Sequence, residues 1–159
     1  MSEVLEVKWP AVRAWLDRVR HAASAIEPLV REMAAMQDAY DQTLSWHTSG
    51  DSSSRQVYSD PTATQAMARA QSYDDQIADM ARRLDALTDM VGEGGKVICA
   101  MGDALGEDHS LAFELYYIDC AETWRDVADE VGCSVKTLYR MRERGYAWID
   151  MRFAGIICV

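Results

Sequence analysis

Basic side chains gather near the end of the chain, in a stretch whose spacing predicts a helix. Lys136 and Arg140 are four residues apart, so they share one helix face, where they can meet phosphate groups or guanine edges. Thr137 and Tyr139 offer further groups that can contact bases or sugars. Residues 135–159 contain five basic and two acidic residues, whereas the whole chain has a net charge of −10. These residue types favour nucleic-acid binding.

Two short helices joined by a turn are expected to position these side chains. Thr123 is followed three residues later by Asp126, which is capping-box spacing. Gly132 stands where a helix needs a left-handed residue to stop, and Ser134 can cap a second helix. An apolar strip joins the two helices: Val127, Ala128, Val131, Leu138 and Met141. This pattern is the sequence signature of a helix-turn-helix, with a recognition helix at about 134–144.

In such a motif the early residues of the second helix enter the major groove, and the first helix crosses the phosphate backbone. The candidate DNA-binding residues are therefore Thr123, Arg125, Ser134, Lys136, Thr137, Tyr139, Arg140, Glu143 and Arg144. Arg142 also belongs to this helix. Aromatic and aliphatic residues after Gly145 predict that the helix continues, with a bend at that glycine.

The run LAFELYYIDCAETWRDVADEVGCSVKTLYRMRERGYAWI resembles sigma-70 region 4 and the sigma-like C-terminal domains of small phage regulators of the ArpU and RinA type. The matching positions are Tyr116, Tyr117, Ile118, Thr123, Trp124, Val127, Ala128, Val131, Gly132, Ser134, Thr137, Leu138 and Arg140. The resemblance implies a transcription regulator of phage or prophage origin that binds promoter or operator DNA in the nucleoid of a bacterial host. Glu143 and the acidic first helix depart from the family pattern.

The composition bounds the class of protein. Hydrophobic residues make up 49% of the chain without any run of eighteen apolar residues, which favours a soluble, cytoplasmic protein without a membrane partner. The acidic N-terminus MSEVLEVKW is not typical of a signal peptide. No phosphate-binding loop, nucleophile elbow or paired-carboxylate motif is present, and the cysteines and histidines are scattered. We therefore expect no enzyme, no cofactor and no metal site.

The net charge of −10 is the main objection to DNA binding. The Debye length is about 8 Å in physiological salt, so distant acidic residues are largely screened from the recognition helix. Acidic residues beside Arg125 are closer and should weaken binding. We expect modest, salt-sensitive affinity with few phosphate contacts per subunit, which calls for a homodimer or for RNA polymerase as a partner.

Two heptad patterns predict two long helices upstream. The first comprises Val12, Leu16, Val19, Ala23, Ile26, Val30, Met33, Gln37, Tyr40 and Leu44, with Gln37 as its only polar member. The second comprises Ala70, Tyr73, Ile77, Met80, Leu84, Leu87, Val91, Gly94, Ile98, Met101 and Leu105. Pro28 predicts either a kink near residues 24–27 or a break into two helices. Residues 47–60 are expected to form a loop that folds the helices into an antiparallel coiled-coil hairpin.

Gly92, Gly94 and Gly95 interrupt the second heptad. Each glycine lowers helix stability by about 1 kcal/mol relative to alanine. The interpretation that we favour is a hinge or a local break. The other is a close helix crossing that leaves no room for a side chain.

The expected architecture is all-α, with a hairpin over residues 1–105 and a helix-turn-helix domain of sigma-70 region 4 type over residues 106–159. Two helices cannot enclose every apolar side chain outside the seams, namely Trp15, Leu29, Met36, Trp46, Met67 and Met90. This surplus favours a twofold dimer through a four-helix bundle. The alternative is a monomer in which the C-terminal domain covers that surface.

Two other functions remain open. The acidic segment 109–131 is also compatible with an adaptor that binds RNA polymerase or a sigma factor. Small terminase subunits of phage packaging machinery likewise join a helix-turn-helix to a coiled coil, although they usually carry the DNA-binding part first. The main prediction is a sequence-specific DNA-binding transcription regulator.

Overall fold

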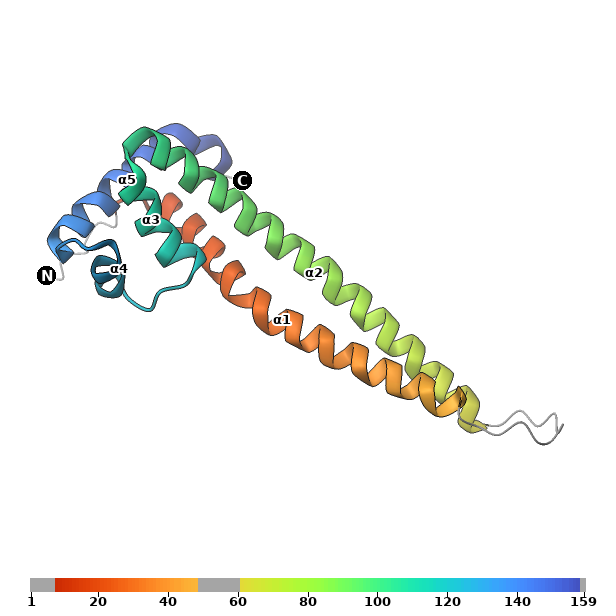
Figure 1. The fold of residues 1–159 in the computed structure, drawn as a ribbon. Helices are drawn as coiled ribbons and strands as arrows, with labels where there is room; N and C mark the ends of the chain where they lie inside the picture. Colours follow the sequence, from red (N-terminus) through yellow and green to blue (C-terminus); the bar gives the residue numbers. More distant parts are fainter. Residues whose placement is uncertain (1–7, 49–60, 158–159) are drawn as a thin grey trace, which may run out of the picture. The chain divides into compact units, whose positions relative to one another are not determined.

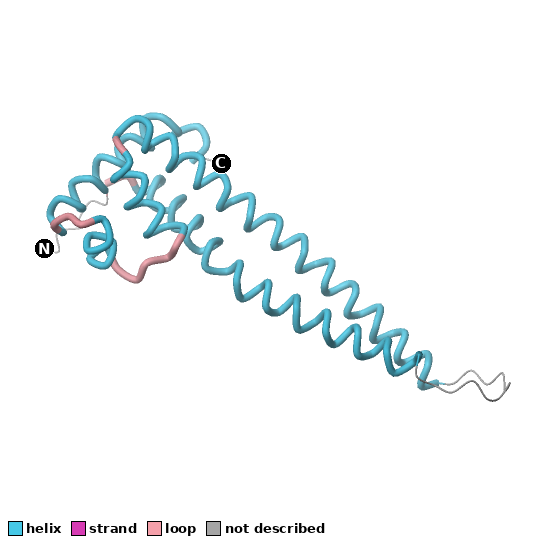
Figure 2. Tube along the Cα trace, in the orientation of Figure 1, coloured by secondary structure: helices cyan, strands magenta, loops and turns pink. Residues whose placement is uncertain are grey.

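The computed structural model describes residues 8–48 and 61–157, and every regular element within these ranges is a helix. The elements, shown in Figure 1 and Figure 2, are α1 (Pro10–Thr48), α2 (Pro61–Leu105), α3 (Glu107–Phe113), the π-helical turn η1 (Glu114–Ile118), α4 (Trp124–Val131) and α5 (Val135–Ile157). The prediction of an all-α fold is confirmed. None of the helices in residues 8–48 and 61–157 combines the length and the hydrophobicity that a membrane-spanning helix needs.

The chain forms two compact units, which divide the long helices between them. Unit 1 comprises residues 1–25 and 87–159, and unit 2 comprises residues 26–86. In unit 2 the two helical segments lie side by side and run in opposite directions (Figure 1). This division differs from the expected boundary at residue 105, because the start of α1 and the end of α2 share a hydrophobic core with the C-terminal helices.

The core of unit 1 is built from α1, α2, α3 with η1, and α5. Its buried members are Val12, Trp15, Leu16, Val19, Val97, Ile98, Met101, Phe113, Tyr117, Tyr146, Ile149 and Ile157. Most of the apolar area of these side chains is removed from water, which stabilises each by about 1.5–3 kcal/mol. The C-terminal helices therefore rest on the ends of the long helices rather than forming a separate domain.

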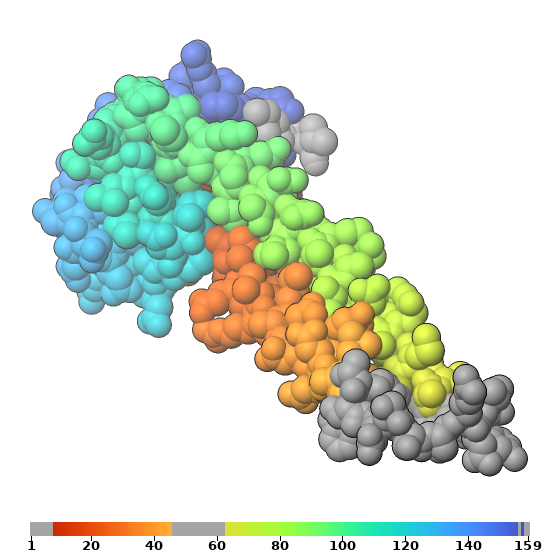
Figure 3. Space-filling view, turned by 45° about the vertical axis from the view of Figure 1, so that its right-hand side comes forward, coloured from red at the N-terminus to blue at the C-terminus, as the bar shows by residue number. Residues whose placement is uncertain are grey.

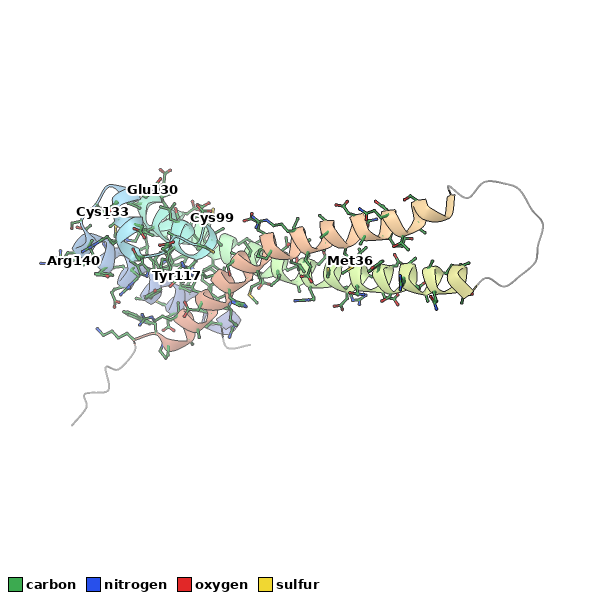
Figure 4. All side chains as sticks on the ribbon, turned by 90° about the horizontal axis from the view of Figure 1, so that it is seen from below. Met36, Cys99, Tyr117, Glu130, Cys133 and Arg140 are labelled. Atoms are coloured by element: carbon green, nitrogen blue, oxygen red, sulfur yellow. The ribbon has the colours of Figure 1, made fainter. Side chains whose placement is uncertain are left out.

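The seam of α1 follows a register that the sequence pattern gives only in part. Val30, Gln37 and Leu44 were expected in the seam but are exposed. The residue before each of them faces inward instead: Leu29 is buried and Met36 is half-buried, and Figure 4 labels Met36 between α1 and α2. A seam through these earlier positions keeps steps of three and four and leaves Gln37 outside it. Its polar member is the half-buried Thr43, whose hydroxyl donates to the backbone oxygen of Ala39 at 2.8 Å.

This register also accounts for much of the apolar surplus that favoured a dimer. Trp15 and Leu29 are buried, and Met90 packs against the core of unit 1. Met67 remains 74% exposed, and the side chain of Trp46 lies outside the described residues. The sequence argument for a dimer thus loses most of the side chains on which it depended.

Pro28 lies inside α1, which continues through it as one helix. The alternative of two separate helices is therefore wrong, and the kink stays a prediction. The proline removes one backbone hydrogen bond. Burial of the neighbouring Leu29 offsets part of this cost. The expected loop is outside the described residues over 49–60, and α1 itself continues to Thr48.

The glycines of α2 differ in what surrounds them. The helix is continuous from Pro61 to Leu105, so the favoured local break is wrong. A Cβ atom added to Gly94 would lie 2.5 Å from Val19 Cγ1, whereas added Cβ atoms at Gly92 and Gly95 would meet nothing within 4 Å. Gly94 is therefore the close helix crossing, because only a residue without a side chain lets α1 approach so near.

Helix α5 extends beyond the expected end of the recognition helix and keeps helical backbone angles at Gly145, where a bend was expected. It runs from Val135 to Ile157, and the non-helical backbone angles occur at Phe153 rather than at Gly145. Gly145 is buried, and an added Cβ there would lie 2.5 Å from Phe113 Cζ. This glycine therefore marks a close packing contact with α3 and not a hinge.

Candidate nucleic-acid interface

The turn between α4 and α5 is built by local hydrogen bonds that the sequence anticipates. Thr123 accepts a hydrogen bond from the backbone N–H of Asp126, whose carboxylate accepts one from the Thr123 N–H, so the capping box is confirmed. Gly132 ends α4 with φ of 77° and donates to Ala128 O. Ser134 then caps α5, because its Oγ accepts from the Thr137 N–H at 3.1 Å.

A second, smaller core lies beneath this turn. Its buried members are Ala112, Val127, Ala128 and Leu138, and Val131 and Cys133 pack against it. Ala128 is completely buried, so the close approach of α5 to α4 depends on a small side chain at that position. The predicted apolar strip is therefore confirmed at its centre, and it fixes how α5 is rotated about its axis.

Arg142 lies on the inner side of α5, among aromatic rings. Its guanidinium carbon is 4.6 Å from the ring centroid of Tyr139, 5.4 Å from that of Trp124 and 5.9 Å from that of Tyr146. Its terminal nitrogen also lies 3.7 Å from a carboxylate oxygen of Glu143. Each cation–π contact of this kind stabilises the folded state by about 0.5–2 kcal/mol. Arg142 thus holds α5 against the rest of unit 1.

A stack of three side chains joins Trp124 of α4 to α1. The rings of Trp124 and Tyr116 stack with centroids 4.0 Å apart. The guanidinium of Arg20, on α1, lies 4.1 Å from the ring centroid of Tyr116. Arg20 also donates hydrogen bonds to Tyr116 O and, at 2.9 Å, to Ala121 O. Tyr116 lies in the last turn of η1 and Ala121 follows it. No further helical turn supplies donors to these two carbonyls, so Arg20 of α1 supplies them.

Two buried tyrosines connect η1 to α5 behind this stack. The hydroxyls of Tyr117 and Tyr146 are 2.6 Å apart. Burial raises the pKa of both phenols, so both stay neutral and can share one hydrogen bond. Tyr117 is buried and Trp124 packs against the core of unit 1, so neither ring is free to stack on a base. Figure 4 shows Tyr117 inside this part of the molecule.

The outer face of α5 carries the cationic surface, which we define as Lys136, Arg140 and Arg144. All three side chains are exposed, and no acidic group in the described ranges lies within ion-pair distance of them. They border a shallow depression of ≈ 710 Å³, together with Val135, Tyr139 and Glu143. Figure 4 shows Arg140 at the outer edge of unit 1. The structure therefore brings five of the predicted site residues to one surface.

The remaining predicted residues lie elsewhere or are already engaged. The Thr123 hydroxyl donates to the Asp126 carboxylate at 2.7 Å, and the hydroxyls of Ser134 and Thr137 are 2.9 Å apart. Their first role is to cap helices, because these bonds occupy their polar atoms. Arg125 is exposed in the first turn of α4 and does not line the depression.

His109 of α3 lies near one end of the cationic surface. It is 9% exposed, and its Nε2 has no hydrogen-bond partner among the described residues. Burial lowers the pKa of His109, and the positive charge of Arg144 lowers it further. The histidine therefore stays neutral near pH 7 and adds no positive charge to the surface.

Sequence reasoning left Arg142 and Arg20 without a role. Arg142 is four residues from both Leu138 and Tyr146, which are buried. This spacing places Arg142 on the inner face of α5, and it could have been recognised from the sequence. Arg20 gives no such signal, because its partners lie about a hundred residues away in the chain.

Comparisons of the chain with protein-family models, curated proteins and solved structures found no match. The resemblance to sigma-70 region 4 therefore stays a prediction.

Proposed function

We propose that this protein is a sequence-specific DNA-binding transcription regulator in which α4 and α5 act as a helix-turn-helix. The observation that carries the proposal is the cationic surface. Its three side chains recur every four residues along about 12 Å of α5, exposed and without acidic partners among the described residues. A helix with its side chains is about 10–12 Å wide, which matches a major groove about 12 Å wide.

Rigid support on the inner face strengthens this proposal. Leu138 and Tyr146 are buried, and Arg142 contacts Trp124 of α4, so the inner face of α5 is held against the rest of unit 1 while its outer face stays exposed. Tyr139 lies between the two faces: it is 44% exposed and its ring is held by Arg142. A fixed aromatic edge beside two cations suits contact with a thymine methyl group or with sugar.

The acidic face of α4 opposes DNA binding. Asp129 and Glu130 are exposed there and repel phosphate. Each subunit offers only a few cations against this repulsion, so we propose that a homodimer brings two such surfaces to adjacent half-sites. The exposed Val30, Leu44 and Met67 of unit 2 are the apolar side chains that the second subunit would cover.

The experiment is selection of bound sequences from random DNA, followed by mobility shift of the selected duplex. Lys136→Ala/Arg140→Ala should weaken binding at least tenfold. Arg82→Ala/Arg83→Ala is the matched control, because it removes the same charge from exposed positions of unit 2. Equal affinity of the two double variants would favour the adaptor hypothesis, in which RNA polymerase or a sigma factor is the partner. A ring of many subunits in light scattering would favour a packaging subunit.

A further inference from the structure

A groove on unit 1 lies between the end of α2 and the α3–η1 segment. It has a volume of ≈ 530 Å³ and follows α2 from Val91 to Asp103, which corresponds to about 18 Å of helix. The surfaces of these two segments adjoin in the space-filling view (Figure 3). Its position is set by Gly102, because an added Cβ there would lie 2.6 Å from Ser110 Oγ of α3.

The groove has an apolar floor and an acidic rim. Val91, Ile98 and Ile118 provide the floor, together with the bare backbone of Gly95. Asp103, Glu107 and Glu114 line the rim, all exposed, and no lysine or arginine lines the groove. Within the described ranges, none of these carboxylates has an ion-pair partner.

We propose that this groove binds an amphipathic helix of a partner protein, with an apolar stripe on one face and lysine or arginine beside it. Two helical walls with an apolar floor fit a third helix, which anchors itself through side chains three and four residues apart. Glu107 and Glu114 are seven residues apart, so cations two turns apart on the partner can face both. The acidic rim excludes DNA.

A second copy of this chain is disfavoured as the occupant by charge. Each copy has a net charge of −10, so association through an acidic surface meets repulsion. The groove also lies apart from the cationic surface, with which it shares no lining residue. The two surfaces can therefore be tested independently, and the proposal goes beyond DNA binding.

The test uses the full chain and a fluorescent synthetic peptide of about 18 residues, long enough to span the groove, with leucines at heptad a and d positions and lysines beside them. A second peptide carries glutamate in place of each lysine. Anisotropy should show binding of the lysine peptide in the micromolar range, weakened by added salt, and at least hundredfold weaker binding of the glutamate peptide. Absence of lysine-peptide binding up to about 1 mM would overturn the proposal.

Gly95 and Gly92 provide a matched pair of variants. Both lie in α2 with open space around an added Cβ, but only Gly95 lines the groove. Gly95→Leu should fill the floor and lower peptide affinity at least tenfold, whereas Gly92→Leu should leave it unchanged. Both should melt no lower than the unmodified protein, because leucine favours helix more than glycine does. Equal loss in both variants would contradict the proposal.

The acidic rim is tested by Glu107→Gln/Glu114→Gln against Asp85→Asn/Asp89→Asn, which changes the charge equally at exposed positions outside the groove. Only the first pair should weaken peptide binding and flatten its salt dependence. DNA affinity of the Gly95→Leu variant should be unchanged, so failure of one proposal does not imply failure of the other. If the unmodified protein is a dimer and Gly95→Leu makes it a monomer in the absence of peptide, a second copy of the chain occupies the groove. That result would overturn the assignment.

Discussion

Replacing glycines in α2 by alanine one at a time tests how the long helices are held in unit 1. Gly92→Ala and Gly95→Ala add a methyl group in open space, so each should stabilise the protein by about 0.5–1 kcal/mol through helix propensity. Gly94→Ala gains the same propensity but places Cβ 2.5 Å from Val19 Cγ1 and 3.0 Å from Cγ2. Val19 is completely buried and cannot turn away.

Gly94→Ala and Gly95→Ala gain the same helix propensity, so the difference between their stabilities measures the steric cost at Gly94. Overpacking a core by one methyl group costs about 1–3 kcal/mol, so Gly94→Ala should be less stable than Gly95→Ala by about that amount. Combining Gly94→Ala with Val19→Ala removes the clashing methyl groups. The double variant should therefore be more stable than the sum of the single effects by about 1–3 kcal/mol.

Urea unfolding followed by tryptophan fluorescence is the appropriate assay, because Trp9, Trp15, Trp124 and Trp148 all belong to unit 1. Circular dichroism at the same urea concentrations shows whether unit 2 unfolds in the same transition. The reasoning is refuted if Gly94→Ala is as stable as Gly95→Ala. That outcome would mean that α1 and α2 separate without cost at this crossing.

Three further predictions concern single side chains. Thr123→Ala should lower the free energy of unfolding by about 1 kcal/mol in urea, because α4 loses its capping box; no loss would mean that the cap is not formed. Arg140→Met should reduce the slope of log Kd against log salt for DNA by about 1, whereas Arg142→Met, which removes an inward charge, should leave the slope unchanged; equal changes would contradict the inward placement. His109→Gln should reduce the fall in melting temperature between pH 7.5 and 5.5. Burial lowers the pKa of His109 in the folded state, so the unfolded state binds the proton more readily and stability is lost as pH falls below about 6.5. Parallel pH profiles would refute this.

Local signals in the sequence predicted much of the α4–α5 region. The capping box at Thr123, the left-handed Gly132 and the cap at Ser134 each depend on residues within four positions of one another, so their chemistry is readable in the chain. The inward position of Arg142 was equally readable from its spacing to Leu138. The sequence analysis left Arg142 out of the DNA-binding set but assigned it no packing role, because its partner Trp124 lies on another helix.

Other features depend on contacts between distant segments and could not be predicted in this way. The exposed Val30 and the buried Leu29 are adjacent apolar residues, and only the partner helix decides which of them enters the seam. Gly94 and Gly95 are likewise adjacent and identical, yet only one faces Val19. Arg20 donates to the carbonyls of Tyr116 in η1 and of Ala121 after it, and no pattern within α1 indicates that role.

The salt dependence of DNA binding tests the central claim most directly. Affinity for a selected duplex should be measured from about 50 to 200 mM salt for the unmodified protein, for Lys136→Ala/Arg140→Ala and for the control Arg82→Ala/Arg83→Ala. The first pair should reduce the magnitude of the slope by about 2, since each phosphate contact contributes about 0.9. The control should leave the slope unchanged. Identical slopes for all three proteins would contradict the claim that the outer face of α5 binds DNA.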